Sequence, residues 1–243
     1  MHIVRLPNDQ EMDADLGPAT AVLIKLMGER TMPKSIAGIT IPDSRIAREA
    51  TELVRDVESQ LLFDHSVRVF LFGSLRGKEQ GLKFDPELLY LGAMFHDTGL
   101  TKRYSSSTER FEVDGANTAR GFMRDHGLPE ADIDLVWDAI ALHTTPGIPK
   151  HKKPEVALVT AGVEMDVLGL GFTEVPESVR EQVLQAHPRV NFKEGIIRAF
   201  ADGIKHKPET TFGNVKADVL ERMVPGFQRT NFCNLILNSD WRD

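Results

Sequence analysis

The sequence predicts an all-α fold, and three observations support the prediction. Apolar residues recur at steps of three and four through most of the chain, as they do on the buried face of a helix. Proline and helix-capping residues stand where several of these runs begin. Evidence for strands is thin, since only residues 36–41 (IAGITI) alternate weakly. No internal repeat appears, and no linker rich in Pro, Gly and Ser divides the chain.

The first expected helix follows Pro42-Asp43-Ser44 and runs unbroken through residues 45–63, with Ile46, Ala50 and Val54 among its regularly spaced apolar positions. The next begins at Asp85-Pro86, where aspartate serves as N-cap and proline occupies the first helical position. It leads into His96-Asp97, and Gly99 is well placed to end it.

Further helices are expected in order along the rest of the chain. They run from about Val113 to Gly127, from Pro129 into His143, from Pro154 to Asp166, over residues 177–187 and 192–204, and in a short C-terminal segment, NFCNLILNSDWRD. Glycines 169 and 171 end the helix that holds Asp166; they form no phosphate-binding loop, because no strand precedes them. Residues 1–34 are the least regular and are predicted to form an N-terminal arm before a main domain over residues 35–243.

Composition restricts the possible partners. Hydrophobic residues make up 41% and charged residues 27%, as in an ordinary globular protein. A net charge of −7 argues against a nucleic acid as the main partner, because phosphate contacts need clustered cations. The single cysteine, Cys233, permits no intrachain disulfide. With no signal peptide and no apolar run long enough to cross a bilayer, the sequence predicts a cytoplasmic protein without a membrane partner. A homo-oligomer is neither predicted nor excluded.

The chemistry is expected to centre on His96-Asp97, at the end of an apolar helix. Neighbouring helical side chains point about 100° apart, so both reach one ion beside the helix. His65, His143 and Asp166 also lie within or beside apolar helical runs, where such groups are costly to bury unless paired or bound to metal. Imidazole and carboxylate suit zinc, iron or manganese. A lone histidine on an apolar helix is usually a hydrogen-bonded core residue; the ordered set favours a metal site.

The order His…His-Asp…Asp resembles the HD-domain superfamily of metal-dependent hydrolases, which are helical bundles with ligands from different helices. Several segments are also similar to the cyanamide hydratase subfamily, from about residue 35 to the C-terminus. They are FDHSVRVFLFG, LGAMFHDTGL, RFEVDGANTAR, IALHTT, the stretch from GLGFTEVP through HPRVNFKEG, and NFCNLILN. The resemblance implies an HD-domain bundle carrying extra N- and C-terminal helical segments.

The subfamily resemblance also implies one Zn²⁺ ion per chain, held by His65, His96, Asp97 and Asp166, with Fe²⁺ or Mn²⁺ less favoured. Two-metal HD enzymes carry an additional histidine four residues before a Gly-Ala pair. Here that position, before Gly115-Ala116, is Phe111, which cannot bind a metal. A single ion is therefore expected, although His143 and Glu112 remain as ligands for a second.

The implied reaction adds water to a small nitrile such as cyanamide, giving urea, and belongs to the lyases. Zinc lowers the pKa of a bound water toward about 7, and the hydroxide attacks the nitrile carbon. We expect His143 beside that water, Thr144 to hydrogen-bond the substrate, and Glu112 to take part in proton transfer. Asp114 is a weaker candidate. The alternative for Glu112 is a structural ion pair with Arg110 or Arg120, and Asp114 is equally suited to capping a helix.

Two other hypotheses remain. One is a phosphohydrolase acting on nucleotides or other phosphate esters, for which Lys102, Arg103, Arg68 and Arg76 are the available cations. The other is a helical interaction protein with a structural zinc ion. It ranks last, because structural zinc sites are usually rich in cysteine. The polar loop at residues 105–108 reads equally as a lid over the site or as a plain solvated loop.

Overall fold

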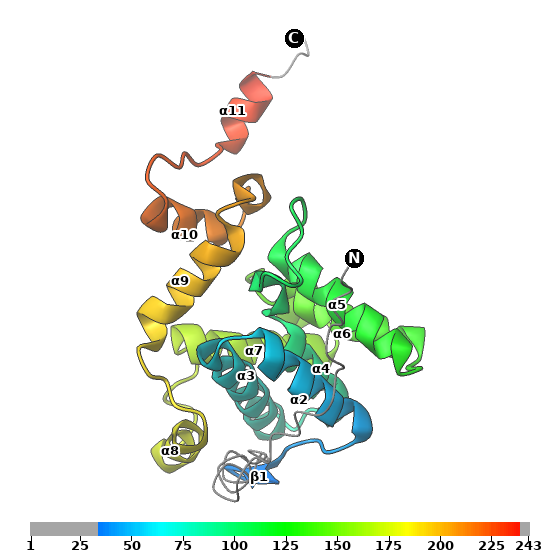
Figure 1. Ribbon diagram of the computed structural model, residues 1–243. Helices are drawn as coiled ribbons and strands as arrows, with labels where there is room; N and C mark the ends of the chain where they lie inside the picture. Colours follow the sequence, from blue (N-terminus) through cyan, green and yellow to red (C-terminus); the bar gives the residue numbers. More distant parts are fainter. Residues whose placement is uncertain (1–33, 239–243) are drawn as a thin grey trace, which may run out of the picture. The chain divides into compact units, whose positions relative to one another are not determined.

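The computed structural model describes residues 34–238, and over these residues it confirms the all-α prediction. Nearly all regular structure there is helical (Figure 1). The two described strands, β1 (Ser35–Ile36) and β2 (Ile39–Thr40), pair antiparallel around a turn at Ala37 and Gly38. The weak alternation over residues 36–41 therefore marks a small hairpin. The predicted arm over residues 1–34 lies, apart from Lys34, outside the described residues.

The predicted single helix over residues 45–63 is wrong, because the structure forms two helices there. Helix α2 (Arg45–Val57) ends at Glu58, whose backbone is extended, and α3 (Gln60–Glu79) starts after it. The Ser59 hydroxyl accepts a hydrogen bond from the Leu62 amide and caps α3. Serine side chains compete for backbone donors in this way, so the capping residue ends the apparent run.

Helix α3 is the centre of the packed helices and is buried on most sides. It packs against α4 (Pro86–Phe95) and α7 (Pro154–Val163), while α5 (Phe111–Asp125) packs against α6 (Glu130–Leu142). Two glycines bring α3 and α7 into backbone contact. A Cβ at Gly73 would lie 2.5 Å from the Leu158 carbonyl oxygen, and one at Gly162 would lie 2.2 Å from that of Val69. Only glycine permits this approach.

Asp85 caps α4 as predicted, accepting bonds from the amides of Glu87 and Leu88. The expectation that Gly99 ends this helix is wrong, because α4 stops at Phe95 and Gly99 lies inside the 3₁₀ turn η1 (Thr98–Leu100). A Cβ at Gly99 would lie 2.0 Å from the Phe111 carbonyl oxygen. The glycine thus lets the turn after His96-Asp97 pack directly on the first residue of α5.

The chain beyond α6 continues through several shorter elements. A 3₁₀ turn, η2 (Pro149–His151), precedes α7, and a π-helical turn, η3 (Glu164–Leu168), extends α7 until Gly169 ends it in the left-handed region, as predicted. Next come α8 (Glu177–Ala186), α9 (Phe192–Ile204), η4 (Pro208–Thr211), α10 (Lys216–Met223) and α11 (Phe232–Leu237). Of these helices, only α10 was not predicted. None of the described helices is both long and apolar enough to cross a membrane.

Candidate metal centre

Three of the four predicted ligands converge on one buried point. His65 comes from α3, and His96 and Asp97 follow the end of α4. The Nε2 atoms of His65 and His96 are 3.2 Å apart, and Oδ2 of Asp97 lies 3.3 Å from His96 Nε2 and 3.7 Å from His65 Nε2. One donor atom from each residue lies within 4.8 Å of the others. All three side chains are essentially inaccessible.

Hydrogen bonds fix which nitrogen of each histidine is free. His65 Nδ1 donates to Oδ2 of Asp166 at 2.7 Å, and His96 Nδ1 donates to the Ala93 carbonyl oxygen at 2.7 Å. The Nε2 atoms of both rings therefore carry lone pairs, and these face each other. Two acceptor nitrogens at 3.2 Å repel unless a cation or a proton lies between them. This arrangement is that of metal-ligating histidines, whose other nitrogen is bonded to a carboxylate or carbonyl.

Asp97 and His143 supply further free acceptors. Both oxygens of Asp97 are buried without a hydrogen-bond partner among the described residues, and so is Nε2 of His143, which lies 3.7 Å from Asp97 Oδ1. Burial opposes ionisation of Asp97, but His96 outweighs it, with help from His65 and His143, so the pKa of Asp97 lies well below its usual range. An ionised, buried carboxylate with both oxygens free fits a divalent cation.

Asp166, the fourth predicted ligand, lies beside His65 and outside the converging group. Its Oδ1 accepts from Arg68 Nε at 2.8 Å and Arg189 Nη1 at 2.6 Å, and its Oδ2 accepts from His65 Nδ1 and from Arg68 Nη2 at 2.9 Å. Burial opposes its charge, but His65 and Arg68 outweigh this and hold the pKa of Asp166 well below its usual range. In this structure the carboxylate orients His65, and direct ligation by Asp166 stays a prediction.

His143 ends α6 with its Nδ1 bonded to the Ile140 carbonyl oxygen at 2.6 Å, which again leaves Nε2 as an acceptor. Its ring contacts those of His96 and Phe111 edge to face. Burial, together with the neighbouring His96, lowers the pKa of His143 to about 4. The ring is therefore neutral at pH 7, as a proton acceptor must be. The structure thus places the His143 ring beside His96 and Asp97, while its catalytic role stays a prediction.

Glu112 and Thr144, the other two predicted catalytic residues, contact each other. The Thr144 hydroxyl donates to Oε1 of Glu112, and so do Arg110 Nη2 at 2.9 Å and Lys216 Nζ. Burial opposes ionisation of Glu112, but Lys216 and Arg110 outweigh it and lower the pKa to about 2. The Arg110 ion pair considered for Glu112 thus forms, while Arg120 pairs with Asp134 instead.

Some residues around the centre were not foreseen. Glu58 is buried next to Ser66, whose hydroxyl donates to it at 3.3 Å; burial and the charge of Asp97 raise the pKa of Glu58 well above its usual range. Lys216 and Arg189 come from distant segments. Glu58 offered no local signal, because Asp56, Ser59 and Gln60 around it are polar as well. Nothing in the local sequence pairs Lys216 with Glu112, 104 positions away.

The helical fold and this buried His-His-Asp group define a metalloprotein that uses nitrogen and oxygen ligands. More narrowly, the chain belongs to the HD domain family, whose model matches residues 62–187. The match starts in α3 and ends directly after α8, so it includes all four predicted ligands and leaves α9–α11 outside. HD domains bind divalent metals, and membership implies a metal-dependent enzyme with hydrolase-type chemistry.

A stretch of 58 residues is 45% identical to part of the bifunctional uridylyltransferase/uridylyl-removing enzyme of Thiobacillus denitrificans. The alignment covers 24% of this chain and 6% of that protein. The chain therefore corresponds to only a small part of this relative.

Proposed function

We propose that the chain is a zinc-dependent hydratase that adds water to a small nitrile such as cyanamide, giving urea. One observation carries the proposal. Among the described residues, the buried polar atoms left free around the centre include four acceptors, namely both Asp97 oxygens, His143 Nε2 and Glu112 Oε2. The free donor beside them is Arg110 Nε, on a guanidinium that already pairs with Glu112. The buried cations nearest them are engaged: Arg68 with Asp166, and Lys216 with Glu112. A phosphate ester would need free cationic donors, whereas a small neutral molecule with N–H groups would not.

The other cations considered for a phosphate clamp do not supply one. Lys102 and Arg103 are exposed, and the Arg103 guanidinium lies over the Tyr104 ring. Arg76 pairs with Glu79 and Glu174 on the surface. Together with the complete burial of His96 and Asp97, this favours a substrate of a few atoms.

The donor set suits zinc, which accepts imidazole nitrogen and carboxylate oxygen and in catalytic sites keeps a position open. His65 Nε2, His96 Nε2 and an Asp97 oxygen would hold it, with Asp166 bonded to the outer nitrogen of His65. Bound there, zinc would polarise the substrate and make water more acidic.

His143 is the proposed proton carrier. In the reaction, the water oxygen bonds to the nitrile carbon and becomes the carbonyl oxygen, while the two π bonds between that carbon and the nitrogen break one after the other. Both protons of the water finish on the former nitrile nitrogen. His143 Nε2, neutral and unpartnered, takes one proton from the attacking water and returns it to that nitrogen. Glu112 accepts an N–H group of the substrate, and Thr144 holds Glu112.

The direct test is to incubate zinc-loaded protein with cyanamide and measure urea. We expect turnover that His96→Ala abolishes. Arg124→Ala, which breaks only the exposed pair with Glu130, should retain full activity. If protein that carries a full zinc complement forms no urea, the proposal is refuted. Elemental analysis of unsupplemented protein should give about one zinc per chain.

A phosphohydrolase is the second candidate, and two observations favour it. The family-level chemistry is of the hydrolase type, and the partly matched relative is named as a uridylyl-removing enzyme. Screening nucleoside monophosphates and uridylylated peptides with Co²⁺ or Mn²⁺ would separate the candidates. Phosphate or nucleotide release without any urea would favour this second function.

A further inference from the structure

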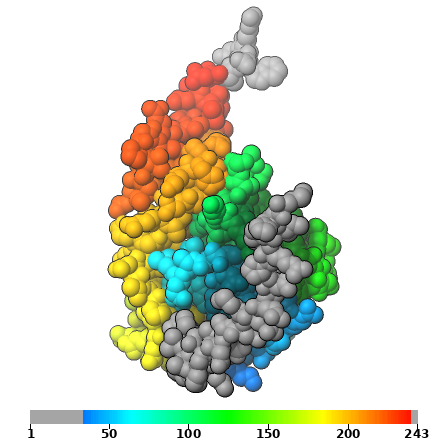
Figure 2. Space-filling view, in the orientation of Figure 1, coloured from blue at the N-terminus to red at the C-terminus, as the bar shows by residue number. Residues whose placement is uncertain are grey.

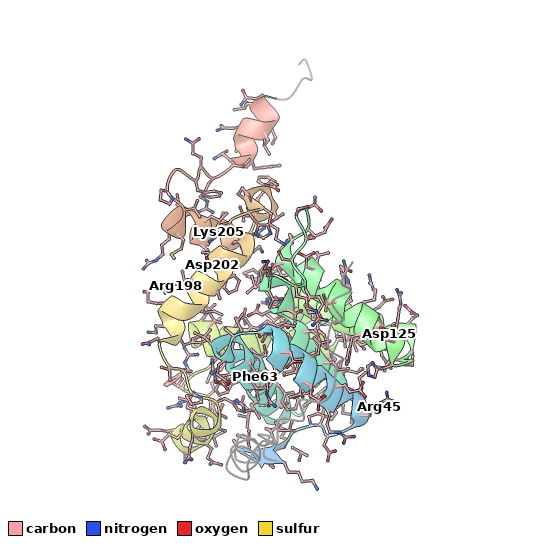
Figure 3. The ribbon with its side chains drawn as sticks, viewed as in Figure 1. Arg45, Phe63, Asp125, Arg198, Asp202 and Lys205 are labelled. Atoms are coloured by element: carbon pink, nitrogen blue, oxygen red, sulfur yellow. The ribbon has the colours of Figure 1, made fainter. Side chains whose placement is uncertain are left out.

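Two lysines that follow the family-matched region are completely buried, although lysine is rarely buried without a specific partner. Lys207 stands just before η4 and Lys216 opens α10, and both have 0% exposure. The nearby Lys205, labelled in Figure 3, directly follows α9 and pairs on the surface with Asp202 of that helix. Burying an ammonium group costs several kcal/mol unless an anion compensates it, so each buried lysine requires an explanation.

Lys207 has a structural explanation. Its Nζ lies 2.6 Å from Oδ2 of Asp114, and the same oxygen accepts the Ser106 backbone amide at 2.9 Å. His206 adds contacts to Ser105 and Ser106, so the loop at residues 105–108 is fastened to the C-terminal segment. In Figure 2 a light-orange surface from the segment that follows α9 adjoins a green surface, in keeping with these contacts. This pair anchors a loop and contacts neither Glu112 nor His143.

Lys216 is different, because its carboxylate partner, Glu112, has a second oxygen that accepts no hydrogen bond from the described residues. Lys216, Arg110 and Thr144 all donate to Oε1 of Glu112, which concentrates three donors on one atom. Oε2 is buried and has no partner among the described residues. A buried carboxylate oxygen without a donor is costly, so a bound donor would be stabilised there. Thr144 connects the group to His143, the adjacent residue, at the rim of the centre.

We propose that Lys216 is a positioning residue, which fixes Glu112 so that Oε2 accepts a hydrogen bond from an N–H group of the substrate. Helix α10, outside the family-matched region, brings this lysine to the site. The inference deepens the proposed function: it assigns the substrate class as small nitriles that carry an N–H donor beside the reacting carbon. Cyanamide has such an amino group, and dimethylcyanamide does not.

The kinetic test compares three variants on both substrates. Wild-type protein should prefer cyanamide over dimethylcyanamide by at least about 100-fold in kcat/KM, because an unmatched buried polar group penalises the analogue. Lys216→Met should raise KM for cyanamide and reduce this preference at least about tenfold, while Lys216→Arg restores part of it. Lys207→Met is the matched control: it removes an equally buried lysine from a carboxylate of the same helix and should leave the preference unchanged.

A second measurement needs no turnover. Carboxyl ¹³C NMR of glutamate-labelled, metal-free protein, with Glu112→Gln to assign the resonance, follows the titration of Glu112. Lys216→Met should move that titration upward by at least about one pH unit, and Lys207→Met should not move it. Failure to form urea would refute the nitrile reaction while leaving this result to stand by itself. If both lysine variants lose stability alike but change neither the titration nor the substrate preference, Lys216 is merely structural and the inference is overturned.

Discussion

Whether Asp166 binds the metal directly decides whether the centre has three protein ligands or four. The substitution Asp166→Asn keeps the shape of the side chain but removes its charge. In the structure the carboxylate bonds His65 Nδ1 at 2.7 Å and both Arg68 and Arg189, and it is not part of the converging group. Loss of a residue that orients a ligating histidine weakens metal binding about 10–100-fold. That corresponds to about 1.4–2.7 kcal/mol.

The assay is zinc competition against a chromophoric chelator, with Asp97→Asn as the reference for loss of a direct ligand. Asp166→Asn leaves Arg68 buried and unbalanced, at a cost of about 3–5 kcal/mol in folding stability. The double variant Arg68→Met/Asp166→Asn removes that charge and keeps the measurement possible if the single variant fails to fold. Equal affinity losses for Asp166→Asn and Asp97→Asn would refute an orienting role and make Asp166 a ligand.

Three further predictions concern the reaction, the packing and acid stability. His143→Gln should lower urea formation about 10²–10⁴-fold with zinc content unchanged, and a parallel loss of zinc would instead identify a ligand. Gly99→Ala should destabilise the protein by about 2–3 kcal/mol in urea unfolding, because its Cβ would meet the Phe111 carbonyl oxygen; Gly121→Ala on the exposed face of α5 has nothing within 4 Å and should stabilise slightly. The pKa of Glu112 is lowered from its ordinary value of 4.5 to about 2 in the folded protein. Its ionised form therefore stabilises the fold above pH 4.5, and this stability is lost as the pH falls from 4.5 to about 2. The loss should be on the order of 3 kcal/mol in metal-free protein, and the stability of Glu112→Gln should vary less with pH over the same range.

Helical periodicity was sufficient to predict α5 to α9, because each of these helices has enough regularly spaced apolar residues or a clear start and stop. It was insufficient at two places. The break between α2 and α3 depends on Ser59 capping a new helix within an uninterrupted apolar pattern. Helix α10 has only Ala217 and Leu220 as buried apolar residues, too few to give a recognisable pattern in eight positions.

The candidate ligands could be proposed from the sequence because they lie in, or next to, strongly apolar helices. Their partners were not predictable, because the contacts join residues far apart in sequence. Arg68 reaches Asp166 across 98 positions, and α9 and α10 return toward η1 and α5 by a path that no local pattern encodes. The predicted roles of His143, Glu112 and Thr144 accordingly stay predictions about chemistry, while the structure supplies their neighbours.

The distribution of charge around the centre favours a cation site at Asp97. Asp166 is balanced by Arg68, Glu112 by Lys216, and Asp114 by Lys207, all through direct contacts. Asp97 differs from these carboxylates, because the groups paired with it are all imidazoles. Burial lowers the pKa of His65 and of His143, whereas for His96 the charge of Asp97 outweighs burial and raises the pKa. Among the described residues, Asp97 thus has no lysine or arginine in contact, and both of its oxygens are free of hydrogen bonds. A divalent cation held by Asp97 and the two Nε2 atoms would supply a permanent positive charge, so removal of the metal should weaken this centre first and the balanced ion pairs around it last.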